Sequence, residues 1–263
     1  MFSLTDLLKH RNYFSHKALG MRHPELKEIA ARPIFVVGCG HSGTTLLLRI
    51  LGAHPNIHPI IDESAAFTKK RTYLLRDFDM ETLKAGKKRW VEKTPLHIHH
   101  IENIFKKRPD ARVLVIVRDG RDVATSIKDR KGDVLVGIKR WVRDNSAAEQ
   151  FQNDPRVTFI KYEDLIENFD SEVAQILGFI GEPFSEDVKN YHNLVRHEKL
   201  GHERPPSAAG DNHLEYRMWQ VTQPLFDGRN RWMGALSDEE KSLFKSHAGE
   251  MLIRYGYATD NQW

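Results

Sequence analysis

Residues 38–45, which read GCGHSGTT, have the composition and spacing best suited to anion binding in this sequence. Glycines let a backbone curl until successive N–H groups converge on one point, and the following helix contributes its positive end. An apolar run precedes the segment and a helical pattern follows it, so the pattern predicts a strand–loop–helix phosphate site. The predicted binding residues are Gly40, His41, Ser42, Gly43, Thr44 and Thr45.

Thr44 stands where a nucleotide triphosphatase needs lysine. That lysine neutralises the β- and γ-phosphates of the nucleotide beside a magnesium ion. The loop therefore predicts a less charged donor group, bound without metal. A nucleotide kinase or triphosphatase remains an alternative, which a magnesium requirement would favour.

A second anion site is predicted after the apolar run at residues 112–117, where Arg118 follows directly and Ser126 comes eight residues later. Ligands of parallel α/β sheets bind beyond the carboxyl ends of the strands, so Arg118 is expected on the same side as the loop. Its guanidinium can form a charge-assisted pair with a second phosphate. The competing interpretation is a surface arginine paired with Asp119 or Asp122.

These motifs resemble those of sulfotransferases that use 3′-phosphoadenosine 5′-phosphosulfate (PAPS). The family's 5′-phosphosulfate loop is similar to PIFVVGCGHSGTTLLLRILGAHP, with His41 in place of the usual Arg or Lys. Its 3′-phosphate element is similar to RVLVIVRDGRDVATS, and the segments KYEDL and VTQPLFDGRNRWMG match two further motifs. Together the matches extend over about residues 33 to 257, in the expected order.

The resemblance implies transfer of a sulfuryl group from PAPS to an acceptor hydroxyl or amine, with release of adenosine 3′,5′-bisphosphate (PAP) and without a metal. It implies that Arg118 and Ser126 hold the 3′-phosphate and that Tyr162 lies near the adenine. The implied cofactor-covering loop contributes Arg229, Asn230, Arg231 and Trp232. An ordinary core aromatic is the alternative for Tyr162 and for Trp232.

The resemblance also implies three catalytic residues. Glu63 in IIDES is similar to the glutamate base of tyrosylprotein sulfotransferases, although it comes one residue later than in that pattern. His58 is the alternative base, and a helix cap or salt bridge is the alternative role for Glu63. Lys93 in EKTPLHI is implied beside the leaving oxygen, where protonated His41 could also act. A non-catalytic sensor of the bisphosphate is a further alternative, disfavoured because Lys93 and Glu63 are both present.

HIHHI at residues 97–101 is interpreted as packing or surface histidines, because no acidic or cysteine partner has the spacing of a metal site. Cys39 is interpreted as a small residue in a tight loop, since no base partner for a nucleophile is evident.

The elements that must position these residues alternate along the chain, which predicts an α/β fold. Together with the resemblance, the alternation implies a P-loop-like three-layer fold, in which helices flank a central, mainly parallel sheet. Strands are predicted at 34–38, 89–92, 112–117 and 157–162, and helices at 44–53, 97–107, 119–130, 138–151, 171–180 and 238–255. One domain is expected over residues 1–263, with a helical extension at 1–32 and an irregular covering segment at 191–234.

Composition sets the remaining limits. A hydrophobic content of 40% with 29% charged residues indicates a globular protein, and no apolar run is long enough to cross a bilayer, so an integral membrane protein is not expected. One cysteine excludes an internal disulfide and favours a cytoplasmic location. The sequence contains no stripe of basic residues interleaved with aromatic residues, so a nucleic-acid partner is not expected. The acceptor stays open among carbohydrate, lipid, phenol and peptide, as does the oligomeric state.

Overall fold

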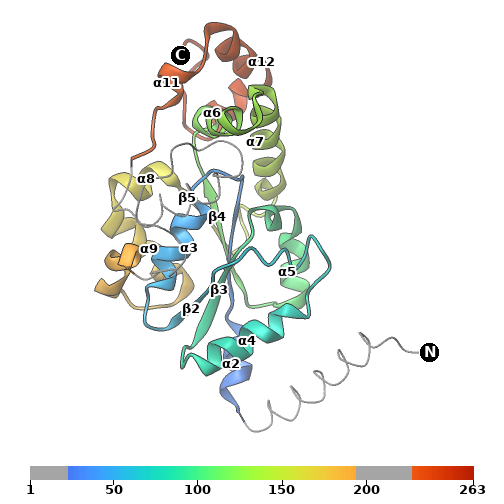
Figure 1. Cartoon of the computed structure of the whole chain (residues 1–263), viewed down its shortest axis with the longest axis vertical. Helices are drawn as coiled ribbons and strands as arrows, with labels where there is room; N and C mark the ends of the chain where they lie inside the picture. Colours follow the sequence, from blue (N-terminus) through green and yellow to red (C-terminus); the bar gives the residue numbers. More distant parts are fainter. Residues whose placement is uncertain (1–22, 194–226) are drawn as a thin grey trace, which may run out of the picture.

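A computed structural model describes residues 23–193 and 227–263 of the chain. Its centre is one five-stranded, all-parallel sheet in the order β2-β3-β1-β4-β5 (Figure 1). The strands are β1 (Ile34–Gly38), β2 (Ile57–Ile60), β3 (Arg89–Lys93), β4 (Arg112–Val117) and β5 (Val157–Lys161). The predicted α/β class with a parallel central sheet is confirmed.

β1 lies in the middle of the sheet and brings the motifs together. All its residues are buried, because helices cover both sheet faces and the continuous apolar run IFVVG suits such a strand. Val36 of β1 is in register with Lys93 of β3, and Gly38 with Ile116 of β4. The loop after β1, the end of β3 and the residue after β4 therefore emerge at the same edge of the sheet, the one formed by the carboxyl ends of its strands.

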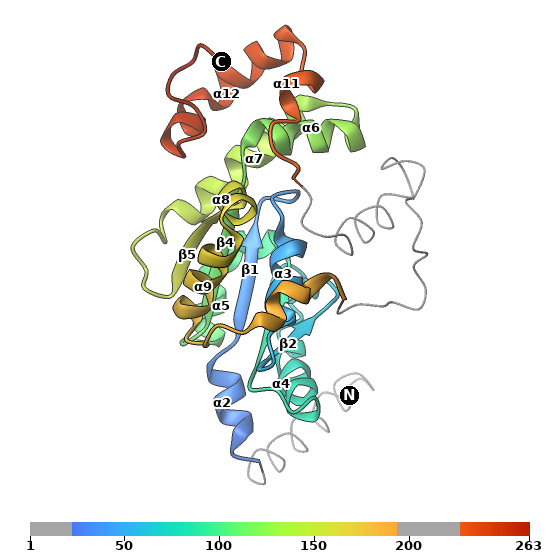
Figure 2. The same ribbon diagram turned by 90° about the vertical axis from the view of Figure 1, so that its left-hand side faces the viewer.

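Helices complete the layers on both faces of the sheet (Figures 1 and 2). They are α2 (Glu25–Ala31), α3 (Thr44–Gly52), α4 (Leu74–Lys84), η1 (Pro95–His100), α5 (Ile101–Lys107), α6 (Gly120–Lys131), α7 (Val134–Glu149), α8 (Tyr162–Glu167), α9 (Phe169–Ile180), η2 (Glu186–Asn193), α11 (Trp232–Ala235) and α12 (Asp238–Arg254). No helix within these two described ranges is long and apolar enough to cross a membrane.

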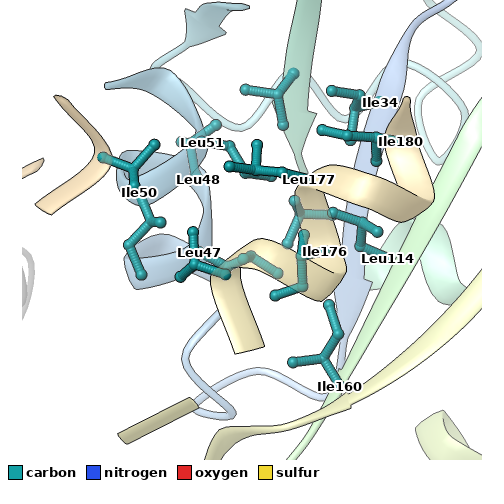
Figure 3. Packing of buried hydrophobic residues seen from close by; sticks show 14 of the residues in the cluster. Ile34, Leu47, Leu48, Ile50, Leu51, Leu114, Ile160, Ile176, Leu177 and Ile180 are labelled. Carbon is teal, nitrogen blue, oxygen red and sulfur yellow. The ribbon is translucent and has the colours of Figure 1, made fainter. Parts of the chain in front are cut away.

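The apolar core has a part on each face of the sheet. Alternate residues of β1 point to opposite faces, so Ile34 and Val36 pack with α3 and α9, as Figure 3 shows for Ile34, Leu47 and Ile176. Phe35 and Val37 pack on the other face with residues of α4 and α5. A third cluster joins α6, α7, α11 and α12 beside the loop. Burial on both faces holds the end of β1 in a fixed position.

Local signals explain where the helices near the site begin and end. Asp119 accepts a hydrogen bond from the Arg121 N–H at the start of α6, and Gly132 ends the helix with a φ of 78°. Ser237 and Glu240 form a capping box at the start of α12. Each signal lies within a few residues of the helix end that it sets, which is why the predicted bounds of α6 and α12 differ little from those observed.

Several sequence-based expectations were wrong in detail. The edge strand β2 was not predicted, because Pro59 argues against a strand; at an edge, however, the missing N–H of proline is tolerated. The helix α4 was also not predicted. The single helix expected at 97–107 is divided into η1 and α5, and the strand expected to reach residue 162 ends at Lys161, where α8 begins.

Two predicted segments are described only in part. Residues 1–22 of the expected extension lie outside the described residues, and its residues 25–31 form α2. Residues 194–226 of the expected covering segment also lie outside them. The flanks of that segment form η2 and the short helix α11.

Candidate active site

The loop between β1 and α3 forms a cradle with buried hydroxyls. The side chains of Ser42 and Thr44 are 0% and 1% exposed, and their hydroxyls have no hydrogen-bond partner within the described part of the chain. Buried hydroxyls are rarely left without partners unless a ligand or water completes them. These atoms, with the N-terminal turn of α3 that includes Thr45, fit a tetrahedral anion such as a phosphate or sulfate.

The loop backbone has a shape that depends on residue type. Gly43 has a φ of 94°, and a Cβ there would lie 2.7 Å from Cδ2 of Tyr162, so glycine is required by conformation and by space. His41 has a φ of 75°, which is uncommon for a non-glycine residue. Such strain is consistent with a loop shaped for a ligand.

Arg118 lies between the loop and α8. Its guanidinium donates to the His41 carbonyl at 3.2 Å and to the Gly228 carbonyl. Its Cζ is 4.5 Å from the ring centroid of Tyr162. The side chain of Arg118 is 11% exposed, and its Nη2 lies 3.8 Å from Oδ2 of Asp122, a long ion pair. Arg118 is thus largely buried at the loop, which weighs against a purely surface role.

Tyr162 and Ser126 complete this side of the site. Burial raises the pKa of Tyr162, so its phenol stays protonated at neutral pH. The Ser126 hydroxyl on α6 is 2.9 Å from Nδ1 of His41. His41 is therefore directed towards the residue predicted to hold the 3′-phosphate. Its predicted action at the leaving oxygen stays a prediction.

Glu63 and Lys93 meet at the same edge of the sheet. Lys93 Nζ donates to Glu63 Oε1 at 2.6 Å. The lysine side chain is 6% exposed and that of Glu63 is 46% exposed, so one partner is fixed and the other can reach solvent. Within the described residues Glu63 Oε2 has no hydrogen-bond partner. The salt bridge considered for Glu63 exists, and it places the predicted base beside the predicted cation.

A buried network that sequence reasoning missed holds Glu63 in this position. Glu92 is fully buried and accepts hydrogen bonds from the Ser64 N–H and hydroxyl, at 3.3 and 2.7 Å, and from the Thr94 hydroxyl at 2.5 Å. Because Ser64 follows Glu63 and Glu92 precedes Lys93, the network ties the two catalytic candidates to each other. The only signal in the sequence was an acidic residue at the end of a short predicted strand.

His97 completes the network as a hydrogen-bond donor to Glu92. Its Nε2 accepts the Phe67 N–H at 3.2 Å, so its proton is on Nδ1, which is 3.1 Å from Glu92 Oε2. Burial opposes ionisation of Glu92, but the hydrogen bond and electrostatic interaction with His97, together with hydrogen bonds from Thr94 and Ser64, outweigh it and lower the pKa of the carboxyl. His97 is 0% exposed and packs in the core, in agreement with its interpretation as a packing residue.

His58, the alternative base, lies farther along the sheet. It is in register with Trp90, three residues before Lys93, or about 10 Å away at about 3.3 Å per residue. Its nearest acidic group is Glu81 at 3.9 Å, and burial lowers the pKa of its imidazole. This placement favours Glu63 over His58 as the residue beside Lys93.

The segment before α11 approaches Arg118 but is held by its own contacts. Arg229 pairs with Asp227 and Glu167, each at 2.9 Å, and Arg231 pairs with Asp129 at 3.4 Å. Asp122 binds the segment to α6 by accepting the N–H groups of Asn230 and Trp232.

Trp232 lies in the core rather than in an open site. Its ring is 5% exposed and packs in the third apolar cluster, with the Arg121 guanidinium 4.0 Å from the ring centroid. The core interpretation therefore describes Trp232 better than stacking on adenine. Cys39 packs in the same cluster, and burial raises the pKa of its thiol, so it is a poor nucleophile. Among the described residues, no group of three or more His, Cys, Asp or Glu side chains could hold a metal ion.

Comparison with known proteins identifies the family. The chain matches the family described as the sulfotransferase family over residues 33–85 and 69–186, which include the loop, Glu63, Lys93, Arg118 and Ser126. The chain belongs to the sulfotransferase family.

Its curated relatives are distant. Protein-tyrosine sulfotransferase 2 of Gallus gallus is 22% identical over 264 residues, which cover 85% of this chain and 69% of that protein. Protein-tyrosine sulfotransferase of Drosophila melanogaster is 23% identical over 243 residues, which cover 77% of this chain and 47% of that protein. An uncharacterised protein of Aquifex aeolicus is 24% identical over 220 residues, which cover 67% of this chain and 28% of that protein. The chain thus spans less than half the length of two of these relatives.

Solved structures share its fold. The sulfotransferase domain of the Synechococcus olefin synthase has a TM-score of 0.57 at 16% identity, covering 82% of this chain and 94% of that domain. A mouse sulfotransferase complexed with PAP has a TM-score of 0.56 at 17% identity, and the match covers 84% of this chain and 85% of the mouse chain. At such low identity the likeness establishes the fold, which agrees with the family assignment.

Proposed function

We propose that this chain transfers the sulfuryl group of PAPS to an acceptor hydroxyl or amine and releases PAP. The observation that carries the proposal is the meeting, at one sheet edge, of two anion-binding elements with an acid–lysine pair. The loop hydroxyls of Ser42 and Thr44 and the Arg118–Ser126 pair suit the two ends of a bisphosphate. The mouse sulfotransferase of the same fold was crystallised with PAP.

Each region has a distinct task in this proposal. The loop N–H groups and hydroxyls bind the 5′-phosphosulfate, and Arg118 with Ser126 binds the 3′-phosphate. His41 contacts Ser126 and so links the two elements. Arg229, which is half-buried, and Arg231, which is exposed, remain candidate clamps on the cofactor.

Glu63 and Lys93 supply the chemistry. PAPS contributes a sulfuryl group bonded to a phosphate that leaves well when its charge is neutralised. Glu63 takes the proton of the acceptor through Oε2, the oxygen that Lys93 does not bind. Lys93, fixed by burial, places its ammonium at the oxygen that becomes negative as the bond to sulfur breaks. Sulfuryl transfer, like phosphoryl transfer, then depends mainly on positioning and charge.

Isothermal titration calorimetry tests the binding part of the proposal. PAP should bind without magnesium, and adenosine 5′-monophosphate, which lacks the 3′-phosphate, should bind much more weakly. Equal affinity for the two would contradict the 3′-phosphate assignment. Tight binding of ATP that requires magnesium would instead support a kinase or triphosphatase.

A turnover screen tests the enzymatic part. Labelled PAPS is offered with carbohydrate, lipid, phenol and peptide acceptors, beginning with tyrosine peptides because two relatives are named protein-tyrosine sulfotransferases. Transfer of label to one class identifies the acceptor. PAP binding without transfer to any acceptor would favour the non-catalytic sensor. The cytoplasmic location inferred from the single cysteine belongs to the same proposal.

A further inference from the structure

Arg140 of α7 lies directly against the phosphosulfate loop, although neither predicted anion element includes it. A Cβ added to Gly40 would lie 2.6 Å from Nη2 of Arg140 and 3.1 Å from its Cζ. The guanidinium therefore occupies the space where the residue at position 40 would carry its side chain. Any side chain at position 40 would displace the guanidinium from this position.

Asp144, one turn further along α7, fixes the orientation of Arg140. Its Oδ2 accepts a hydrogen bond from Nε of Arg140 at 3.3 Å. Asp144 is 0% exposed, and its Oδ1 accepts from His99 at 2.8 Å and from Arg143 at 2.7 Å. Because the carboxylate is bound to Nε, the two amino groups of Arg140 remain available. Neither of them donates a hydrogen bond within residues 23–193 and 227–263.

The charges at this point leave a positive excess beside the loop. Two arginines share the single buried carboxylate of Asp144, so one permanent positive charge is not neutralised by it. The loop itself has threonine where a triphosphatase has lysine, and its His41 is directed to Ser126. The loop itself therefore offers a 5′-phosphosulfate only neutral hydroxyls and backbone N–H groups, and the positive charge of Lys93 is shared with Glu63.

We infer that Arg140 binds the 5′-phosphosulfate group of the donor and supplies the positive charge that the loop lacks. This rests on the proposed function, because it assigns a further residue to the same donor site. The arginine's planar fork suits the oxygens of a phosphate or sulfate, and its attachment to Asp144 orients the fork before the ligand arrives.

Two ligands and two matched variants test the inference. PAP carries a 5′-phosphate and adenosine 3′-monophosphate does not, so their affinity ratio reports on the 5′ side alone. Arg140→Gln should weaken PAP binding by about tenfold or more and leave the 3′-monophosphate within about twofold. Arg143→Gln is the control: it removes the same charge from the same carboxylate, but its side chain is 61% exposed. It should change neither affinity by more than about twofold.

The possible outcomes separate the inference from the function. Unchanged PAP affinity in Arg140→Gln, or an equal loss for both ligands, would overturn the role of Arg140 and leave the proposed function standing. Failure of the unaltered chain to bind PAP would overturn both. If Arg140→Gln does not fold, Arg140→Lys and Arg140→Met replace it. PAP should bind the lysine variant more tightly than the methionine variant, and equal binding would refute a role for the charge.

Discussion

The two halves of the candidate site differ in how their polar groups are satisfied. On the loop side, the hydroxyls of Ser42 and Thr44 are buried without partners, as expected for groups that await an anion. On the catalytic side, Glu63 and Lys93 already neutralise each other, and Glu92 is fully hydrogen-bonded behind them. The first half is built to bind, whereas the second is built to hold opposite charges in place until substrate arrives. Substitutions should therefore affect binding and turnover separately.

Glu63→Gln should have the largest effect and should affect turnover alone. Loss of the base is expected to lower kcat by about 10²–10⁴-fold, while PAP affinity changes by no more than about twofold. Steady-state kinetics with labelled PAPS and calorimetry with PAP measure the two quantities. The neighbouring exposed acid offers a control in Asp62→Asn, which should retain activity. Normal turnover of Glu63→Gln would move the base to His58 or elsewhere, and His58→Gln would then be the decisive variant.

Arg118→Lys should affect the other half of the site. The lysine keeps a charge but loses the fork that contacts both the loop and the segment at Gly228, so PAP affinity should fall by about 10–100-fold. Binding of adenosine 5′-monophosphate should change much less, which calorimetry can measure. Arg156→Gln removes an arginine from an ion pair at the opposite end of β5 and should leave both affinities unchanged. An equal loss for both ligands would show that Arg118 only supports the fold.

Glu92→Gln should have the smallest effect, on stability and on its pH dependence. The NH₂ of the new glutamine would face the Ser64, Thr94 and His97 groups, which are themselves hydrogen-bond donors. The free energy of unfolding should therefore fall by about 1–3 kcal/mol at neutral pH. The folded-state pKa of Glu92 is lowered, so its contribution to stability is complete above the usual carboxyl pKa and is lost as pH falls through the folded value.

Chemical denaturation at neutral and acidic pH measures both quantities. The variant should lose less stability than the original chain on acidification. Glu102→Gln, which breaks an exposed pair with Lys106, is the control and should change stability by less than about 1 kcal/mol. Identical acid dependence for Glu92→Gln and the original chain would show that the carboxylate is not the group that the network stabilises.

Features that depend on neighbouring residues were predictable. The strand–loop–helix at residues 38–45, the buried strands β1 and β4 and the capped helices follow from short-range patterns of apolar residues, glycines and caps. The strand β2 was missed because the local signal of Pro59 opposes a strand, and only its edge position in the sheet makes it acceptable.

Sequence alone determined that this chain has a glycine-rich loop without a lysine after one apolar strand, an arginine after another, and an acid and a lysine in separate motifs. Tertiary structure decided which of these meet: Glu63 with Lys93, His41 with Ser126, and Arg140 with Gly40. The partners of each pair are separated by 30 to 100 residues of chain. Their contacts depend on the strand order and register of the parallel sheet, which no local pattern encodes. Burial of β1 on both faces holds that register, and so brings residues distant in sequence to one edge.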